Sequence, residues 1–341
     1  MMRRTGCRAP ARRTKLGRRT FLATMTAFLS SPRAVLADDE FPAHFIGANT
    51  AIEGYGLFEC IDLLRRLGFR TIEVQDLDGV PEPTPGRYPG FRLHEADEEL
   101  RARVREALQG FDCVTTHLPY WGLEYFSSED KEARHGIETM ERALETTAFL
   151  GAKIGVIHPK SGPGMSLKQT WPLMIRRFRR WGDLAKASGF RLALETGYPL
   201  SVEDFVRLVY EVDHDSVGAT IDVGHQGRYR ELVDRVNPEA RGTPEGIRAY
   251  NDINMELVER LGEKLIHFHI HDIEPDTWVE HKPLIYGFID YPRLLARLKE
   301  IRYRGLLVFE IGGPPAEMPG YLADAKRIMD RYVQVAQESD T

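Results

Sequence analysis

The stretch Ile266–Asp272 (IHFHIHD) combines a short apolar run with three alternating imidazoles and ends in a carboxylate. Successive side chains of a β-strand point to opposite faces, so His267, His269 and His271 share one face. Buried imidazoles need partners, because an unpaired buried polar group costs on the order of several kcal/mol. The stretch therefore predicts a buried strand whose polar face serves a site, although spacing does not choose among the three imidazoles.

Five other apolar runs end in the same kinds of residue. Their terminal polar residues are His117, His158, Glu195, Asp222 and Glu310. Together with His269 they follow one another at steps of 27–47 residues, about the length of one strand, one helix and two loops. A closed parallel barrel is the simplest arrangement that brings all six ends to one mouth. The sequence thus predicts an α/β chain folded as a single (β/α)8 TIM barrel.

Strand and helix patterns alternate along the whole chain from about residue 44. The expected strands are 44–49, 69–75, 112–117, 152–158, 190–195, 217–222, 264–270 and 305–310. Amphipathic stretches at 201–211 and 245–261 predict helices, and Thr243-Pro244 is typical of a helix start. Glycines between helical segments and strands predict left-handed helix ends at Gly68, Gly151, Gly189, Gly262 and Gly305. No interdomain linker is evident.

The first 37 residues differ in composition from the rest of the chain. They contain nine Lys or Arg and no acidic residue, and all of the basic residues but Arg33 precede the apolar stretch 21–29, which the small residues of 35–37 follow. This order predicts a secretory signal peptide cleaved after Ala37, with residues 38–341 as the barrel domain. Arg18-Arg19 resembles the twin-arginine motif that exports folded proteins. We therefore expect a periplasmic or otherwise exported protein.

Charge and hydropathy restrict the partners of the remaining chain. The whole chain has a formal charge of −5, so residues 38–341 carry about −14 once the nine basic residues of the leader are removed. An acidic body repels phosphate backbones, which argues against a nucleic-acid partner. No segment approaches the ~20 apolar residues of a membrane span, so stable membrane insertion is not expected. The sequence does not decide whether the chain forms a homo-oligomer.

Three carboxylates and one imidazole form the candidate metal site. Glu195, Asp222 and Glu310 would supply oxygen ligands, and one of the three alternating imidazoles would supply nitrogen. Such a mostly oxygen ligand set suits one divalent ion, Mn²⁺, Mg²⁺ or Zn²⁺, and leaves positions for substrate oxygens. Any one of these residues alone would be explained as well by a structural ion pair. Their recurrence at consecutive strand ends favours a site.

The ordered series resembles the xylose-isomerase-like TIM barrel superfamily, which includes sugar phosphate isomerases and epimerases, ketose 3-epimerases and type IV apurinic endonucleases. The resemblance covers roughly residues 44–335. It rests on His117-x-Pro119-Tyr120, His158-Pro159, Glu195, Asp222-x-x-His225, His269-x-x-Asp272 and Glu310. It implies that His269 is the metal-binding imidazole and that His225 contacts substrate. It also implies that Glu195 and Glu310 bind metal and handle protons on opposite faces of a sugar carbon.

Five residues are secondary candidates for substrate binding. His117 and His158 would bind substrate or a second metal, or be hydrogen-bonded imidazoles at the barrel mouth. Trp121 would stack on a sugar face or pack at the rim. Lys160 and Arg228 would hold an anionic or hydroxylated substrate, or be solvated loop charges.

Four other residues carry expectations of a different kind. Glu73 ends the second strand and would be an ion pair at the barrel floor or a site residue. Trp278 lies on a long loop and would form part of a lid. Cys60 and Cys113 are expected to be buried thiols rather than a disulfide, since a barrel of this size does not need one.

Three classes of enzyme fit these residues. The first is a metal-dependent sugar isomerase or epimerase, in which two glutamates move a proton through an enediolate. The second is a keto-sugar glycoside lyase or hydratase that uses the same enediolate but expels a β-substituent. The third is a type IV apurinic endonuclease, which needs three metals. Its Asp-x-His pattern is absent at Val279-Glu280-His281, and the acidic charge and export signal also argue against it.

Export and loop composition together predict the substrate class. Phosphorylated sugars are kept in the cytoplasm, so an exported enzyme should act on an unphosphorylated or oxidised sugar. The loops after the strands contain no Gly-rich turn opening a helix, the arrangement that commonly binds phosphate. A non-catalytic sugar-binding barrel is the remaining alternative, and the full set of acid–base residues argues against it.

Overall fold

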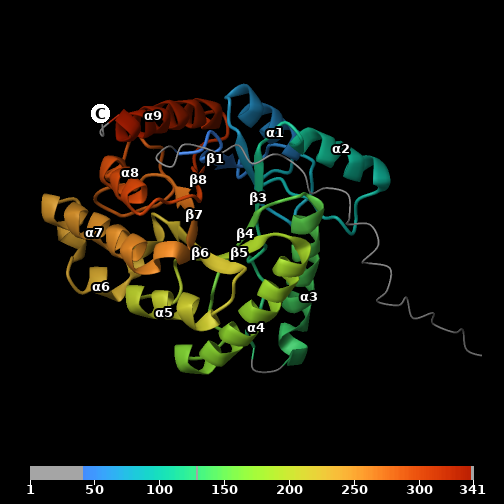
Figure 1. Cartoon of the computed structure of the whole chain (residues 1–341), viewed down its shortest axis with the longest axis horizontal. Helices are drawn as coiled ribbons and strands as arrows, with labels where there is room; N and C mark the ends of the chain where they lie inside the picture. Colours follow the sequence, from blue (N-terminus) through green and yellow to red (C-terminus); the bar gives the residue numbers. More distant parts are fainter. Residues whose placement is uncertain (1–40, 128–129, 339–341) are drawn as a thin grey trace, which may run out of the picture. The chain divides into compact units, whose positions relative to one another are not determined.

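A computed structural model describes residues 41–127 and 130–338. Its strands form one closed parallel barrel in which neighbours in sequence are hydrogen-bonded neighbours in space (Figure 1). The strands are β1 (Ile46–Asn49), β2 (Thr71–Val74), β3 (Cys113–His117), β4 (Ile154–Ile157), β5 (Arg191–Glu195), β6 (Val217–Asp222), β7 (Leu265–Ile270) and β8 (Leu306–Phe309). The predicted (β/α)8 TIM barrel is confirmed, and each strand lies within its expected range. The leader at 1–37 lies outside the described residues.

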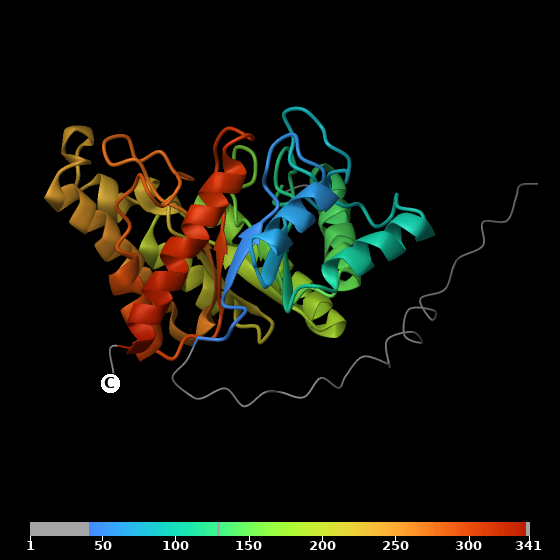
Figure 2. The same cartoon turned by 90° about the horizontal axis from the view of Figure 1, so that it is seen from above.

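Helices surround the strands on the outside of the barrel, as Figure 1 shows. They are α1 (Leu57–Arg66), α2 (Glu98–Leu108), α3 (Asp130–Phe149), α4 (Leu167–Ser188), α5 (Val202–Val212), α6 (Arg230–Val233), α7 (Pro244–Leu261), α8 (Tyr291–Glu300) and α9 (Met318–Glu338). Long loops follow β2, β6 and β7 and project from one side of the barrel (Figure 2). This is the side at which the parallel strands end, where active sites of such barrels are built.

Helix ends follow local sequence signals, with two exceptions. Gly262, after α7, has a positive φ of 52° but a ψ of −125°, which lies outside the left-handed helical region predicted for it. The Thr243 side chain accepts a hydrogen bond from the Gly246 N–H at the start of α7, as expected, and Gly189 ends α4 in the left-handed conformation. Gly305 was expected to do the same before β8, but the left-handed residue there is Arg302, with φ 53°. Gly305 instead permits close packing, since a Cβ atom there would lie 2.1 Å from the Tyr303 hydroxyl oxygen.

The hydrophobic core has two parts. The larger part fills the space between the strands and the helices and includes fully buried side chains such as Phe178 and Trp181. The smaller part includes residues of the barrel's interior face: Cys113, Ile154, Val156, Ala193, Leu306 and Val308. Cys60 and Cys113 are free buried thiols, as predicted. Burial raises the pKa of Cys60 to about 12 and that of Cys113 to about 11, so both thiols stay protonated.

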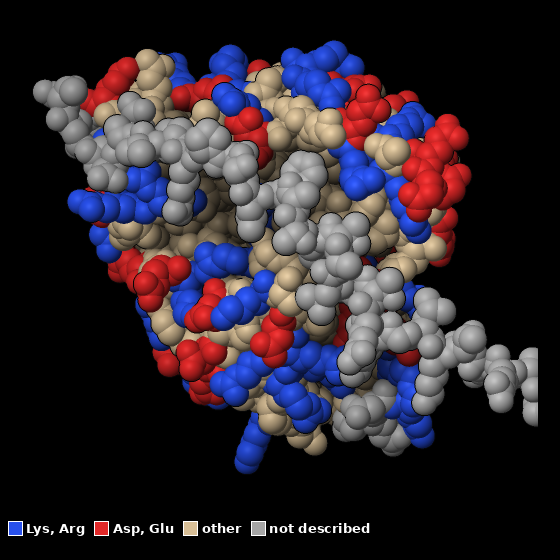
Figure 3. Space-filling view, turned by 45° about the vertical axis from the view of Figure 1, so that its right-hand side comes forward, with Lys and Arg blue, Asp and Glu red and all other residues tan. Residues whose placement is uncertain are grey.

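The outer surface carries charges of both signs. Figure 3 shows Lys and Arg interspersed with Asp and Glu over one face of the molecule. Many of these charges form ion pairs along or between helices, such as Arg297 with Glu300 on α8 at 2.8 Å. Within the described part of the chain, no helix has both the length and the apolar character needed to cross a bilayer.

Candidate functional site

The barrel brings seven of the predicted site residues together at its mouth. They are His117, His158, Glu195, Asp222, His225, His269 and Glu310. Parallel pairing accounts for this, because Asp222 on β6 lies in register with His269 on β7, and His269 with Val308 on β8. Glu310 follows two residues after Val308 and so points to the same face of the sheet.

One imidazole nitrogen is the centre of the cluster. His269 Nδ1 lies 2.6 Å from Glu195 Oε1, 3.0 Å from Glu310 Oε2 and 4.0 Å from Asp222 Oδ2. The four predicted metal ligands therefore surround one point. Glu195, Asp222 and His269 are fully buried, whereas the side chain of Glu310 is 13% exposed. Glu310 is thus the most accessible carboxylate of this set.

The charges of the cluster compensate one another. Burial opposes the charged form of His269, but the carboxylates of Glu310, Glu73 and Glu195 raise its pKa well above the usual value. Burial likewise opposes ionisation of Glu195, and the charges of His158 and His269 outweigh it, so its pKa lies well below the usual range. Three close carboxylates thus favour a positive charge between them, which a protonated imidazole or a bound cation would supply.

The same geometry fits a divalent cation. Asp222 Oδ2 is buried and has no hydrogen-bond partner among the described residues, while Asp222 Oδ1 is hydrogen-bonded to the Gly224 N–H at 2.7 Å. A buried carboxylate oxygen without a partner is costly unless it binds a cation. The donor set of three carboxylates and one imidazole is also one that divalent ions accept.

The structure separates the three alternating imidazoles of β7. His267 Nε2 lies 3.4 Å from Glu73 Oε2, and burial lowers the pKa of His267 to about 4, so its ring is neutral. His271 Nε2 lies 3.0 Å from Asp222 Oδ1, on the side of Asp222 away from the centre. Of the three, His269 is the imidazole that faces Glu195, Asp222 and Glu310 together. The geometry favours His269 as the ligand.

His117 and His158 form a second group around Glu195. Their Nε2 atoms lie 3.3 Å and 2.9 Å from Glu195 Oε2. Burial lowers the pKa of His158, whereas Glu195 raises that of His117 against the effect of burial. Their ligand atoms lie close enough together with that of Glu195 to hold a cation. The expectation that they bind either substrate or a second metal therefore stays open.

His225 lies at the edge of the cluster. Its Nδ1 is 2.8 Å from the Thr196 carbonyl oxygen and its Nε2 is 3.8 Å from Asp222 Oδ2. Burial opposes its charge, but Asp222 and Glu195 raise its pKa to about 9. A charged imidazole beside the cluster is a suitable donor to a substrate oxygen.

Three predicted substrate-binding residues do not contact the cluster. The Lys160 amine pairs with Glu124 Oε1 at 3.6 Å and lies over the Tyr125 ring. Arg228 is exposed and lies 3.7 Å from Glu280 Oε1. Trp121 is 82% exposed at the rim of the mouth.

Two further residues hold the side chains of the cluster in place, one in β2 and one directly after it. Glu73 Oε1 lies 2.8 Å from His269 Nε2, so Glu73 orients the imidazole from behind. Gln75 Nε2 donates to Glu310 Oε1 at 3.1 Å, and its carbonyl oxygen accepts from Asn49 Nδ2. The sequence left the role of Glu73 open, and Gln75 was missed. The period-two spacing of Glu73 and Gln75 was the signal that could have identified it.

The loop after β7 contributes to the mouth in a way that its sequence pattern did not predict. The ligand atoms of Glu280, His225 and His281 lie close together. The Asp-x-His pattern would place a carboxylate at position 279, but the carboxylate near His281 comes from the adjacent residue, Glu280. His281 Nδ1 also lies 2.8 Å from the Glu310 carbonyl oxygen. Trp278, expected in a lid, is buried, and its ring packs against Tyr250 at a centroid distance of 5.1 Å.

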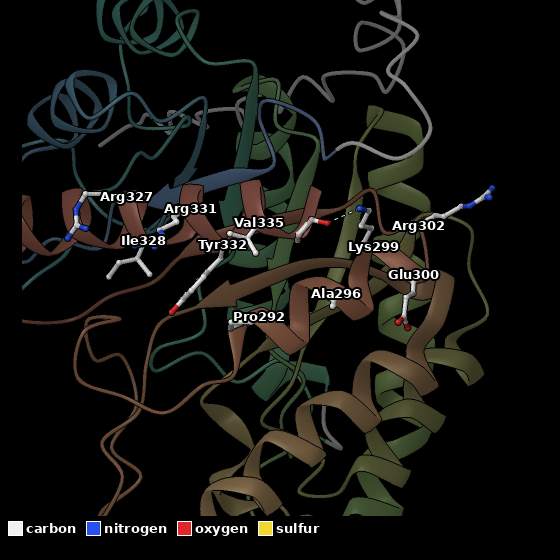
Figure 4. A pocket seen from close by; sticks show the side chains of 11 residues that line it. Pro292, Ala296, Lys299, Glu300, Arg302, Arg327, Ile328, Arg331, Tyr332 and Val335 are labelled. Carbon is white, nitrogen blue, oxygen red and sulfur yellow. Dashed lines mark hydrogen bonds between the residues drawn. The ribbon is translucent and has the colours of Figure 1, made fainter. Parts of the chain in front are cut away.

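Two cavities differ in their relation to the cluster. One, of about 860 Å³, lies between α8 and α9 on the outside of the barrel, with Ala296 and Tyr332 in its wall (Figure 4). None of its lining residues belongs to the cluster. A cavity of about 520 Å³ lies beside the barrel mouth instead, and its lining includes Gln75 and Tyr120.

Residues 61–332 match the family of xylose isomerase-like TIM barrels, and the chain belongs to that family. It is 22% identical over 237 residues to an uncharacterised protein of Methanocaldococcus jannaschii, covering 66% of this chain and 71% of that protein.

Solved structures resemble the barrel over most of its length. A D-tagatose 3-epimerase-like protein has a TM-score of 0.63 at 19% identity and covers 87% of this chain and 99% of its own. A xylose isomerase-like protein from Mycobacterium smegmatis, in complex with magnesium, has a TM-score of 0.60 at 18% identity, with coverage of 88% and 99%. The 3-keto-D-glucoside 4-epimerase of E. coli has 0.55 at 19% identity, with coverage of 83% and 99%. At these identities the likeness shows the fold.

Proposed function

We propose that this protein is a metal-dependent isomerase or epimerase of an unphosphorylated or oxidised sugar. The observation that carries the proposal is the convergence of Glu195, Asp222 and Glu310 on His269 Nδ1 at the barrel mouth. The epimerases among the similar solved structures support a sugar as substrate.

Glu195, Asp222, His269 and Glu310 would hold the ion. When bound, the ion would supply a Lewis acid that makes the C–H beside a sugar carbonyl more acidic. Glu195 or Glu310 would remove this proton to give an enediolate, and the other glutamate would return a proton to the opposite face or to the neighbouring carbon.

The surroundings of the two glutamates fix their positions and keep them ionised. Glu195 comes from β5 and Glu310 follows β8, so they approach His269 from different strands. Each has one oxygen near His269 Nδ1 and a second oxygen held elsewhere. For Glu195 the second oxygen lies near His117 and His158, and for Glu310 it accepts from Gln75. The pKa of each glutamate is lowered, with nearby imidazoles outweighing burial, so each starts as a carboxylate.

A solvent-exchange screen tests the proposal. The metal-loaded and metal-stripped proteins would each be incubated in deuterium oxide with free sugars, oxidised sugars and sugar phosphates, and label would be followed by mass spectrometry. We expect metal-dependent incorporation at one carbon, with substrate mass otherwise conserved. Release of an aglycone or of water would instead identify the keto-sugar glycoside lyase or hydratase. A clear preference for a sugar phosphate would contradict the proposed substrate class.

The substrate class also depends on export, which the leader predicts. We expect an Arg18→Lys/Arg19→Lys variant to stay in the cytoplasm, because the twin-arginine pathway reads the arginine pair. Cell fractionation and N-terminal sequencing of the exported form would check this, with Asp38 as the expected first residue. Unchanged export of the double variant would contradict a twin-arginine signal.

A further inference from the structure

The cavity beside the barrel mouth that is lined by Gln75 and Tyr120, here called the hollow, has no role in the proposed chemistry. It has a volume of about 520 Å³, within the range of about 300–1,000 Å³ typical of small-molecule sites. The loops after β1, β2 and β3 form it, and its lining includes Glu53, Asp76, Arg87, Tyr88, Tyr120 and Trp121.

The hollow is continuous with the cluster through two of its lining residues. The Tyr120 ring lies 4.2 Å from the ring of His158 between centroids, and Gln75 donates to Glu310 at 3.1 Å. A molecule whose reacting carbon lies at Glu310 can therefore extend into the hollow.

The side chains of the hollow suit a neutral polyhydroxylated ring. Tyr88 is 43% exposed and Trp121 is 82% exposed, and both line the same hollow, so two aromatic side chains are available there to a ligand. Aromatic faces pack against the C–H faces of sugars, while carboxylates and a guanidinium hydrogen-bond hydroxyls. The lining has three acidic residues, Glu53, Asp76 and Asp78, against the single cation of Arg87. This balance disfavours a phosphate.

We propose that this hollow binds a second sugar ring, so that the substrate is a glycoside rather than a monosaccharide. The inference rests on the proposed function and adds the substrate's size to it. The reacting ring lies at the cluster, and the glycosidically linked ring stacks between Tyr88 and Trp121. No covalent step is assigned to the hollow.

Matched pairs of substrates test this inference. Each oxidised monosaccharide that exchanges deuterium would be compared with the disaccharide that carries the same reacting ring. We expect kcat/KM for exchange to be about fivefold higher for the disaccharide, since one stacked ring contributes on the order of 1 kcal/mol. The Trp121→Ala and Tyr88→Ala variants should each bring this ratio toward one. Tyr210→Ala is the control, because Tyr210 is 44% exposed on α5, away from the hollow.

The outcomes separate the inference from the proposed function. If the wild-type ratio is near one, or stays unchanged in both the Trp121 and Tyr88 variants, the second-ring site is wrong while the proposed function stands. If neither kind of sugar exchanges deuterium, the proposed function fails and this inference fails with it. Because both side chains are exposed, their loss should leave the fold intact, and the circular dichroism spectra of the variants would show this.

Discussion

The interior face of the barrel contains two clusters of opposite character built on the same strands. On β5, Ala193 belongs to the apolar cluster and Glu195, two residues later, to the charged one. On β8 and just beyond it, Leu306 and Glu310 are divided in the same way. The apolar cluster stabilises the barrel by removing surface from water. The charged cluster contains buried carboxylates, which destabilise the fold unless a cation compensates them. The residues proposed to carry the reaction therefore lie in the part of the barrel that contributes least to its stability.

The largest effect should come from removing charge from the second cluster. Glu195→Gln and Glu310→Gln keep the size of the side chain but lose the base, so deuterium exchange at saturating metal should fall by about 10²–10⁴-fold. Rates would be measured together with bound metal, to separate lost chemistry from lost binding. Glu300→Gln on the outer face of α8 is the control and should keep the wild-type rate. Near-normal exchange in either site variant would remove that glutamate from the proton path.

Metal affinity should depend on pH because a proton and the ion compete for the same nitrogen. The pKa of His269 is raised above its usual value in the metal-free protein, so the ion must displace a proton from His269 Nδ1. Below that pKa, each unit of falling pH should weaken binding about tenfold for each proton released. Calorimetric titrations in buffers of different ionisation enthalpy would count the protons. An affinity independent of pH would contradict this competition.

Sequence reasoning predicted the charged cluster well because its members sit at strand ends. Continuous apolar runs identify strands buried on both faces, and parallel pairing then places every strand end at one mouth. The residues that escaped prediction act from beyond the regular elements. Gln75 lies one residue beyond β2, where only the period-two spacing from Glu73 indicated its direction. Glu280 reaches the site from a loop, where backbone conformation decides the direction of a side chain. Gly305 was misjudged because the close approach of Tyr303, not backbone φ, requires a glycine there.

The smallest effect should come from the apolar cluster. Ile154→Val removes one methylene group from a buried position four residues before His158. The free energy of unfolding should fall by about 1 kcal/mol, with metal content and exchange rate unchanged. Denaturant unfolding followed by circular dichroism would measure the change. A loss of metal in this variant would show that the two clusters are coupled, and the division between them would have to be abandoned.

The central claim is that one ion binds at His269 with three carboxylates, and metal analysis of two neighbouring variants tests it most directly. His267 and His269 lie two residues apart on the same face of β7, yet His269 alone of the two faces Glu195 and Glu310. After equilibration with Mn²⁺, Mg²⁺ or Zn²⁺ and removal of free ion, the account predicts one equivalent in wild type and in His267→Ala, and little in His269→Ala. Retention in His269→Ala with loss in His267→Ala would contradict it.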